Sequence, residues 1–386
     1  MKKYVFIANG FKPTKQERNS REKIKLTNYS LPCLEAANKM GYEIYYGVNR
    51  SKPEELNSDM DIKLYDEHIY RNLFDLRSNY IAYRNLMKLL KNEKIEVIHC
   101  NTPIGGLIGR ICGKKAKIKK VIYTVHGFHF YKGAPLINRT LFMWAEKIMA
   151  TWTDAIITMN QEDYKTAQTF KLKKDGHVYF INGVGIDTKT FSKKEFNKIK
   201  LRESVGCKGS DKVLISVGDL VKNKNHAMAI KTISELGKTD IHLLICGQGP
   251  ELRSLEKLAL ELRVSNQIHF LGYRTDIKEL LQISDAFLFT TFREGLPRSL
   301  MEAMASGLPC IVSKIRGNSD LIEDKKGGYL CNPYEVDEFK QAILDLVNNP
   351  DVQTKMSIFN MEKIKKYDIV EVKKEIIKIY ENVLGS

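Results

Sequence analysis

The sequence predicts an α/β protein made of two doubly wound domains that face each other across a cleft. Three observations predict this fold class. At 386 residues, the chain is longer than one hydrophobic core normally serves. Short apolar runs alternate with helical periods, which is typical of βαβ units in a parallel sheet. The alternation occurs twice, and a lysine-rich, weakly periodic stretch at 192–212 separates the two series.

The first series begins at the amino terminus and predicts the N-terminal domain over residues 1–190. Its predicted strands are Tyr4–Ala8, Glu43–Val48, Val97–Cys100, Val121–Val125, Ala155–Met159 and Val178–Ile181. Its predicted helices are Tyr29–Met40, Tyr80–Lys91, Ile104–Cys112 and Leu136–Thr151. Ligands of open α/β sheets gather at the carboxyl ends of strands, so Gly10, just after the first strand, is a candidate binding residue. No G-x-G-x-x-G follows it, which disfavours a dinucleotide fingerprint.

The second series predicts a C-terminal domain over residues 191–369. Its predicted strands are Val213–Val217, His242–Cys246, Ile268–Leu271, Ala286–Phe289 and Cys310–Val312. Its predicted helices are Asn225–Leu236, Pro250–Leu262, Ile277–Leu281 and Pro297–Ala305. A final run of helical spacing covers Val370–Leu384. Both series therefore predict a Rossmann-like domain.

The most informative stretch lies between Phe292 and Glu302, where a predicted strand leads into a predicted helix. Pro297 suits the first helical position, and the amides from Leu296 to Leu300 are expected to point out of the turn. Exposed amides at a helix start favour a phosphate group. Glu294 precedes the turn and Glu302 lies inside the helix, so a diphosphate there would have a carboxylate on either side. A sugar nucleotide fits this pattern, because carboxylates accept hydrogen bonds from hydroxyl groups.

This stretch resembles the Glu-x7-Glu motif of the retaining glycosyltransferases of family 4, which have the GT-B fold. The resemblance implies that Glu294 contacts the donor sugar and that Glu302 contacts the nucleotide ribose. It also implies that the last helix, 370–386, crosses back to complete the first domain. The donor-binding residues expected between the two glutamates are Gly295, Leu296, Pro297, Arg298 and Ser299.

A second motif, Val217 to His226, is similar to the family's Gly-Arg-Leu stretch with its following lysine. Lys224 matches the lysine that contacts the donor diphosphate. Asp219 stands where the family has an arginine, which puts a negative charge where a cation is expected. Arg298 is the leading candidate to supply the missing charge; Arg293 and Lys222 are the alternatives.

Other strand ends supply the remaining candidate residues. Gly247 follows a strand in the second domain, and Tyr273 and Arg274 follow the next, where the family holds the nucleotide base. In the first domain, His126 lies in a loop similar to the family's His-Gly loop and is expected to touch the transferred sugar. The pair Asp59 and Asp61 resembles a metal-binding D-x-D, but no third ligand supports it, so no metal is expected.

The formal net charge of +16 predicts attraction to a polyanion. The densest basic cluster consists of Lys114, Lys115, Lys117, Lys119 and Lys120. No nucleic-acid-binding motif lies beside this cluster, so the expected partner is an anionic membrane surface rather than nucleic acid. The helix Leu136–Trp152 could lie in a membrane interface, although packing against the first domain is favoured. The seven cysteines form no C-x-x-C and are interpreted as reduced thiols of a cytoplasmic protein.

The expected activity is transfer of a hexosyl unit, with retention, from a nucleotide sugar to an acceptor hydroxyl. The donor is expected to be UDP-linked, with GDP left open, and no cofactor or metal is expected. The expected catalytic residues are His126, Lys224 and Glu294. The expected acceptor is a polyprenyl-diphosphate-linked saccharide of surface polysaccharide assembly, met peripherally at the inner face of the cell membrane. The alternatives are a nucleotide-sugar epimerase of the same fold and a non-enzymatic basic binding protein.

Overall fold

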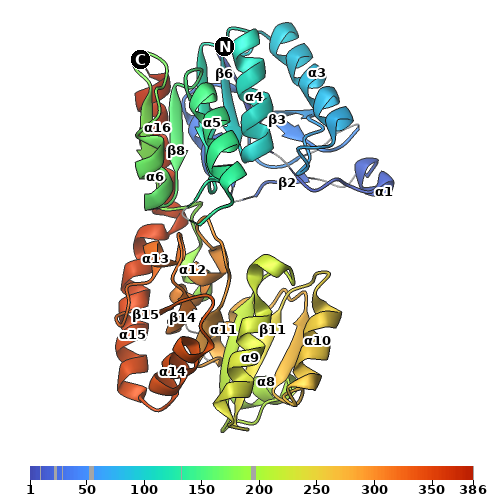
Figure 1. Cartoon of the computed structure of the whole chain (residues 1–386). Helices are drawn as coiled ribbons and strands as arrows, with labels where there is room; N and C mark the ends of the chain where they lie inside the picture. Colours follow the sequence, from blue (N-terminus) through green and yellow to red (C-terminus); the bar gives the residue numbers. More distant parts are fainter. Residues whose placement is uncertain are drawn as a thin grey trace. The chain divides into compact units, whose positions relative to one another are not determined.

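The computed structural model describes residues 1–8, 10–20, 24–27, 29–51, 56–131, 133–192 and 197–385. The chain forms two compact units, which Figure 1 shows by their ribbons. Residues 1–185 and 370–386 make up the first unit, and residues 186–369 make up the second. Each unit is built around its own parallel sheet. The change of unit falls inside the turn at Asn182–Asp187, where Gly183 and Gly185 both have positive φ angles.

The sheet of the first unit has seven strands in the order β5-β3-β1-β6-β7-β8-β9. Strand order therefore reverses between β1 and β6, and such a reversal opens a crevice at the carboxyl ends of the strands. The strands are β1 (Lys3–Ile7), β3 (Glu43–Val48), β5 (Ile62–Asp66), β6 (Val97–Asn101), β7 (Lys120–Thr124), β8 (Ala155–Thr158) and β9 (His177–Phe180). The helices on it include α2 (Leu31–Lys39), α3 (Leu76–Asn92), α4 (Pro103–Lys115), α5 (Met143–Ala150) and α6 (Gln161–Ala167).

The sheet of the second unit has six strands in the order β12-β11-β10-β13-β14-β15. Numbered along the chain this is 3-2-1-4-5-6, and the order reverses between β10 and β13. The strands are β10 (Lys212–Val217), β11 (Ile241–Cys246), β12 (Ile268–Gly272), β13 (Ala286–Phe289), β14 (Cys310–Ser313) and β15 (Gly328–Cys331). The longer helices are α9 (His226–Leu236), α10 (Leu252–Glu261), α12 (Arg298–Ala305), α14 (Val336–Val347) and α15 (Pro350–Lys363).

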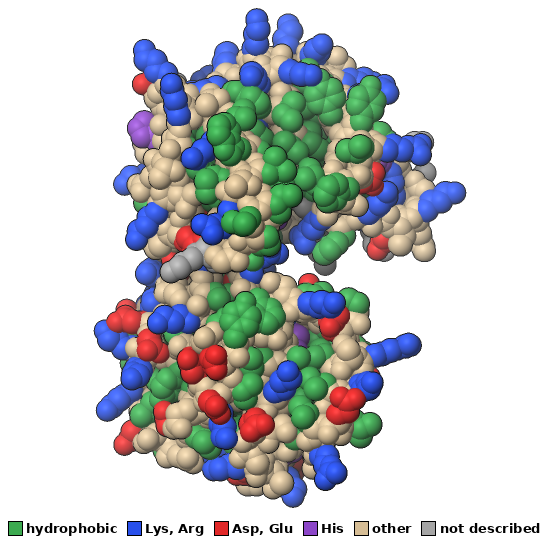
Figure 2. All heavy atoms as spheres, viewed as in Figure 1, with side chains coloured by type: hydrophobic (Ala, Val, Ile, Leu, Met, Phe, Trp, Pro, Cys, Tyr) green, Lys and Arg blue, Asp and Glu red, His purple; other side chains and the backbone are tan. Residues whose placement is uncertain are grey.

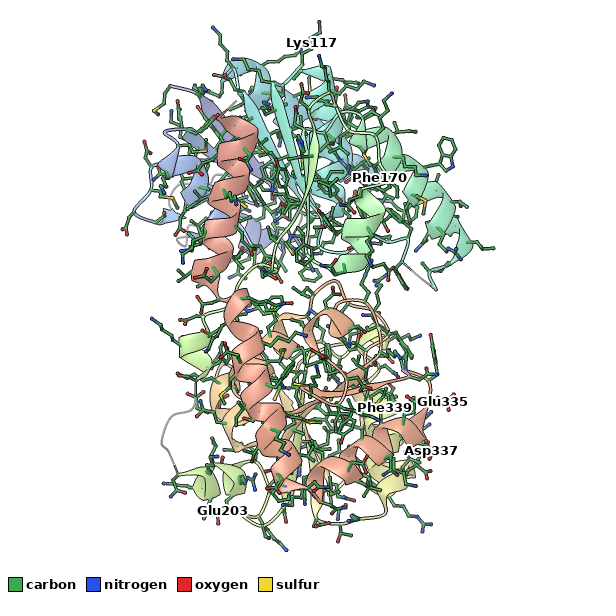
Figure 3. All side chains as sticks on the ribbon, turned by 90° about the vertical axis from the view of Figure 1, so that its left-hand side faces the viewer. Lys117, Phe170, Glu203, Glu335, Asp337 and Phe339 are labelled. Carbon is green, nitrogen blue, oxygen red and sulfur yellow. The ribbon has the colours of Figure 1, made fainter. Side chains whose placement is uncertain are left out.

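Packing of the helices against the sheets follows their apolar stripes. In α14, Phe339 is fully buried and points into the second unit, whereas Asp337 on the opposite face points outward (Figure 3). Phe170 is buried in the first unit, where its ring lies 5.7 Å from that of Phe128. Because each sheet carries its own buried apolar cluster, each unit has a hydrophobic core of its own.

The last helix, α16 (Ile369–Leu384), packs on the first unit, as the family resemblance implied. The Tyr380 hydroxyl lies 2.7 Å from the Tyr4 hydroxyl and 2.6 Å from Nδ1 of His99. All three side chains are buried, and burial lowers the pKa of His99 to about 3, so the imidazole is neutral in this network. A buried hydrogen-bonded network of this kind joins the two ends of the sequence into one core.

The edge strands β5 and β15 were not predicted. A central parallel strand is buried on both faces and appears as a continuous apolar run, whereas these two strands are short and partly exposed. All the strands that were predicted are present, and their ends lie within one residue of the prediction. Helices α14 and α15 were also not predicted.

Candidate active site

The candidate site of the second unit lies where the strand order reverses, at the carboxyl ends of β10 and β13. Lys224 follows β10 and Glu294 follows β13, and their side chains meet, with Nζ 2.7 Å from Oε1. The loops that carry them are hydrogen-bonded to each other. The Asn223 carbonyl accepts from the Phe292 amide at 2.9 Å, and the Asn223 side-chain amide donates to the Arg293 carbonyl at 3.0 Å. The two sequence motifs therefore form one site.

Glu294 is held on three sides. Its Oε1 accepts from Lys224 and, at 2.9 Å, from the hydroxyl of the buried Thr291. Its carbonyl oxygen accepts from Nε of Arg316 at 3.1 Å. Only 12% of its side chain is exposed. Anchored in this way, the carboxylate keeps a fixed direction without a ligand, which is what preorganised recognition requires.

Lys224 is positioned by its surroundings as well as by Glu294. Its Nζ lies 5.1 Å from the centre of the Phe289 ring, a cation–π distance. Its aliphatic stem passes Gly218, where an added Cβ would come within 3.4 Å of it. Asn225, which follows it, adopts a left-handed conformation with φ of 52° and starts α9. The ammonium group is thus placed at the strand end by local backbone geometry.

Helix α12 begins at Arg298, so Pro297 is its N-cap and not its first helical residue, one position from the prediction. A proline N-cap has no side chain that can bond to the first amides, and the first carbonyl-bonded amide is that of Met301, 3.3 Å from the Pro297 oxygen. The amides of the first turn, at Arg298, Ser299 and Leu300, therefore lie at the positive end of the helix dipole. Gly295 and Leu296 lead into this turn, and Leu296 packs on the core.

Within α12, Arg298 and Glu302 form an ion pair one turn apart, with Nε 2.8 Å from Oε1. The Glu302 side chain is 14% exposed, and burial raises its pKa while the bond to Arg298 opposes that rise. The Arg298 guanidinium is therefore shared with Glu302 at the helix tip. This is compatible with a phosphate contact only through its remaining N–H groups, because Nε is already engaged.

The surroundings of Asp219 bear on the hypothesis that another cation replaces the family's arginine. Asp219 is exposed after β10, and its carbonyl oxygen accepts from the Val221 amide at 2.9 Å. Lys222 lies in the short helical turn that ends at Lys224. The structure adds a cation that was not considered, Arg316, beside the Glu294 backbone. The sequence signal that could have identified Arg316 is its position just after β14, because other candidate site residues also follow strand ends.

Glycines allow the strand ends to approach closely on the β12 side of the site. A Cβ on Gly247 would lie 1.9 Å from the Gly218 carbonyl oxygen, so no other residue fits there. The Gly247 amide donates to the Gly272 carbonyl at 2.8 Å. Tyr273 is largely exposed, and Arg274 is held in an ion pair with Asp276. This edge presents backbone groups and a flat aromatic ring.

The first unit has its own group of polar residues at the reversal of strand order. The buried Asn101 is the last residue of β6, and its Oδ1 bonds to Nε2 of His126, which follows β7. Burial lowers the pKa of His126 to about 4, so the ring is neutral at neutral pH. If Nε2 donates to Asn101, Nδ1 is an acceptor. Gly10 lies at the end of β1, where its amide donates to the Ile69 carbonyl at 3.1 Å.

Asp59 and Asp61 are both exposed. Neither belongs to a group of three metal-ligating side chains within the described ranges.

The helical segment at 137–148 exposes a stripe of large apolar side chains, so the favoured prediction that it packs inward is wrong for this face. Ile137, Leu141, Trp144 and Ile148 follow helical spacing and are 49–68% exposed. The opposite face, with Phe142 and Ala150, packs on the core. Figure 2 shows hydrophobic side chains gathered over the face of the first unit that Figure 1 shows covered by α3, α4 and α5. In the part of the chain that the structure describes, no helix has the length and apolar character needed to cross a bilayer.

Two family models match the chain. Residues 197–362 match "Glycosyl transferases group 1", which covers the second unit and its candidate site. Residues 27–160 match "Glycosyl transferase 4-like", within the first unit.

Known proteins are similar over nearly the whole chain. The putative glycosyltransferase EpsD of Bacillus subtilis is 30% identical over 358 residues, 91% of this chain and 92% of that protein. An Escherichia coli UDP-Gal:α-D-GlcNAc-diphosphoundecaprenol α-1,3-galactosyltransferase is 31% identical over 69% of this chain and 70% of its own length. Among solved structures, HepE of Anabaena with UDP and glucose has a TM-score of 0.76 at 17% identity, covering 99% of this chain and 100% of that chain. Sucrose-phosphate synthase of Thermosynechococcus elongatus has a TM-score of 0.82 at 14% identity, with complete coverage of both chains. These likenesses establish the GT-B fold.

Proposed function

The chain belongs to the group 1 glycosyltransferases, and on this basis we propose that it is a retaining hexosyltransferase that uses a nucleotide sugar, UDP-linked by preference. The observation that carries the proposal is the meeting of Lys224 and Glu294 at the reversal of strand order, beside the amino end of α12. The cation and the open helix amides recognise a diphosphate, and the fixed carboxylate recognises a sugar hydroxyl. The Escherichia coli relative, which uses UDP-Gal by its name, supports a UDP-linked donor.

In this proposal the diphosphate lies over the first turn of α12 and against Lys224. Negative charge grows on the diphosphate as the bond to the sugar breaks, and fixed positive groups stabilise it most in the transition state. Lys224, the α12 amides and the outer N–H groups of Arg298 supply this stabilisation. Glu294 accepts from sugar hydroxyls and Glu302 accepts from the ribose hydroxyls. The nucleotide base lies against Tyr273, Arg274 and the Gly247 edge.

No side chain beside the donor is proposed as a covalent nucleophile. The acceptor hydroxyl attacks the face that the diphosphate leaves, and a leaving phosphate oxygen takes the acceptor proton, so configuration is retained. His126, in the first unit, remains the residue that the sequence predicts to contact the transferred sugar. An epimerase would instead need a carboxylate base in the first unit. Burial raises the pKa of Glu67, which follows β5, well above its usual range, and so disfavours the carboxylate form.

The donor preference is tested by thermal shift with UDP, GDP, ADP and their sugars. We expect UDP and UDP-sugars to raise the melting temperature, since a ligand at 100 times its Kd adds about 2.7 kcal/mol of stability. Donor hydrolysis with and without EDTA is expected to proceed at the same rate, because Lys224 and the helix amides do the work of a metal. No shift with any nucleotide sugar would support the basic binding protein, and hydrolysis restored specifically by Mn²⁺ would implicate Asp59 and Asp61.

We further propose that the acceptor is a polyprenyl-diphosphate-linked saccharide in bacterial surface polysaccharide assembly, met by the protein peripherally at the inner membrane face. The Escherichia coli relative acts on a diphosphoundecaprenol-linked sugar by its name. The stripe Ile137–Ile148, with the exposed Arg139 and Lys147 beside it, has the character of an interfacial helix. Apolar burial and basic residues together would hold the protein to an anionic bilayer.

Membrane binding is expected to have two separable parts, measured by sedimentation with phosphatidylglycerol vesicles. Replacing the five clustered lysines with glutamine should remove the salt-sensitive part, since each basic residue near such a surface contributes about 1 kcal/mol. Leu141→Ala with Trp144→Ala should remove the part that survives high salt. Leu260→Ala, at a residue that is 70% exposed on the second unit, is the matched control and should bind like wild type. Equal binding by all four proteins would contradict the proposal.

A further inference from the structure

Three metal-ligating side chains meet at the amino edge of the second sheet. His242 and His269 are the second residues of β11 and β12, and Cys207 follows α8 (Lys198–Ser204). Nδ1 of His242 lies 2.9 Å from Nε2 of His269. The Cys207 sulfur completes the group, in which all three ligand atoms lie within 4.8 Å of one another. Figure 3 labels Glu203 in α8, four residues before Cys207.

A buried carboxylate orients one of these ligands. Oδ2 of Asp211 lies 3.3 Å from Nε2 of His242 and accepts from the Lys208 amide at 2.6 Å. If His242 donates its Nε2 proton to Asp211, its Nδ1 lone pair points to the place shared with His269. Metal-bound histidines commonly use their second nitrogen in this way, bonded to a carboxylate that fixes the ring. A purely structural hydrogen bond between the two rings would not need the thiol.

The surroundings leave space for the second ring. Gly206 has φ of +83°, and a Cβ there would come within 3.0 Å of the Cε1 atom of His269. The two rings are nearly coplanar, with 23° between their planes. Two nitrogens on a tetrahedral Zn²⁺ lie about 3.3 Å apart, so the two nitrogens need to separate by a few tenths of an ångström and the rings need to turn until both nitrogens face the ion.

We propose that Cys207, His242 and His269 bind one Zn²⁺, with Asp211 orienting His242 and a water molecule as the fourth ligand. One thiolate and two imidazoles are a ligand set for Zn²⁺ rather than for Mg²⁺ or Ca²⁺, which prefer oxygen. Cys207 binds as the thiolate, so its proton leaves to solvent when the metal binds. The His269 proton moves to Nδ1, and the net change is one proton released per metal.

Such a site would have a structural role. The ion would tie the segment after α8 to the first residues of two strands, at the edge opposite Lys224 and Glu294. The metal therefore takes no part in sugar transfer, and the proposal stands independently of the donor chemistry.

The test is a Co²⁺ and Zn²⁺ titration of the untagged protein. Wild type should bind one Co²⁺ with the near-ultraviolet charge-transfer absorption of a cobalt–thiolate bond, and Zn²⁺ should displace it and raise the melting temperature. Cys207→Ala should lose both effects. Cys331→Ala is the matched control, because Cys207 and Cys331 are both 3% exposed in the same unit. Absorption that is absent from wild type, or unchanged in Cys207→Ala, overturns the proposal.

Two further variants guard against a folding artefact. His269→Ala, at a partly exposed position, should also lose the absorption if Cys207→Ala proves unstable. Asp211→Asn should keep the absorption at saturating Co²⁺ but bind Zn²⁺ about 10- to 100-fold more weakly, as expected for an orienting residue. Donor hydrolysis by Cys207→Ala in EDTA should equal that of wild type, which separates this site from the proposed metal-independent transfer.

Discussion

Replacing Glu294 with alanine is expected to lower sugar transfer about ten- to a hundred-fold while leaving the binding of UDP nearly unchanged. The carboxylate is fixed by Thr291 and Lys224, so it meets the sugar hydroxyls without reorganisation. A lost hydrogen bond to a charged, partly buried group is worth about 1.5–3 kcal/mol, which gives the expected range. UDP has no sugar at this position and therefore loses nothing directly.

Glu302→Ala provides the matched comparison, since it removes a second glutamate of the same segment. Its proposed partner is the ribose, which UDP and UDP-sugars share, so both should bind more weakly by a similar factor. Isothermal titration with UDP and a UDP-sugar, together with initial rates, separates the two variants. Equal loss of UDP binding in both would show that the assignment of sugar to Glu294 and ribose to Glu302 is wrong.

Lys224→Met is expected to reduce transfer about 100- to 1,000-fold, the typical effect of removing one group that stabilises developing negative charge. Part of any loss could come from folding, because the substitution leaves Glu294 partly buried without its cation. The double variant Lys224→Met with Glu294→Gln removes that charge. We expect it to recover the melting temperature but not the rate. A double variant that recovered both would assign Lys224 a structural role only.

Arg298→Gln serves as the comparison for this prediction. Arg298 shares its guanidinium with Glu302 and is 42% exposed, so its loss should slow transfer less than the loss of Lys224. Arg298→Lys keeps the charge but not the planar fork and should fall between wild type and Arg298→Gln. Wild-type rates in Arg298→Gln would leave Arg316, Arg293 or Lys222 as the cation that offsets Asp219.

The strands and the two motifs could be predicted because buried parallel strands are continuous apolar runs bounded by glycine and polar residues. The ion pair between Lys224 and Glu294 could not be, although both residues were singled out. They are 70 positions apart, and only the reversed strand order makes β10 and β13 neighbours. Sequence periodicity gives the elements but not their lateral order in a sheet. Arg316 was missed for the same reason.

The interfacial helix and the metal ligands show two other limits. Around Trp144 both faces of the helix are apolar, so spacing alone could not decide which face is covered. The core contacts of Phe142 and Ala150 decide it. Cys207, His242 and His269 come from three separate segments and match no metal-binding spacing. Only the register of β11 and β12 brings the two histidines together.

The packing of α16 on the first unit has a consequence for the order in which the chain becomes structured during synthesis. Domains generally form from the amino terminus as the ribosome releases them. Here Tyr4 and His99 are translated before the second unit, but Tyr380, which bonds to both, is translated after it. The apolar surface of the first unit that α16 covers therefore stays open to water until the whole second unit has been translated. A nascent chain halted after Ile369 would present that surface to chaperones, although its second unit would already be complete.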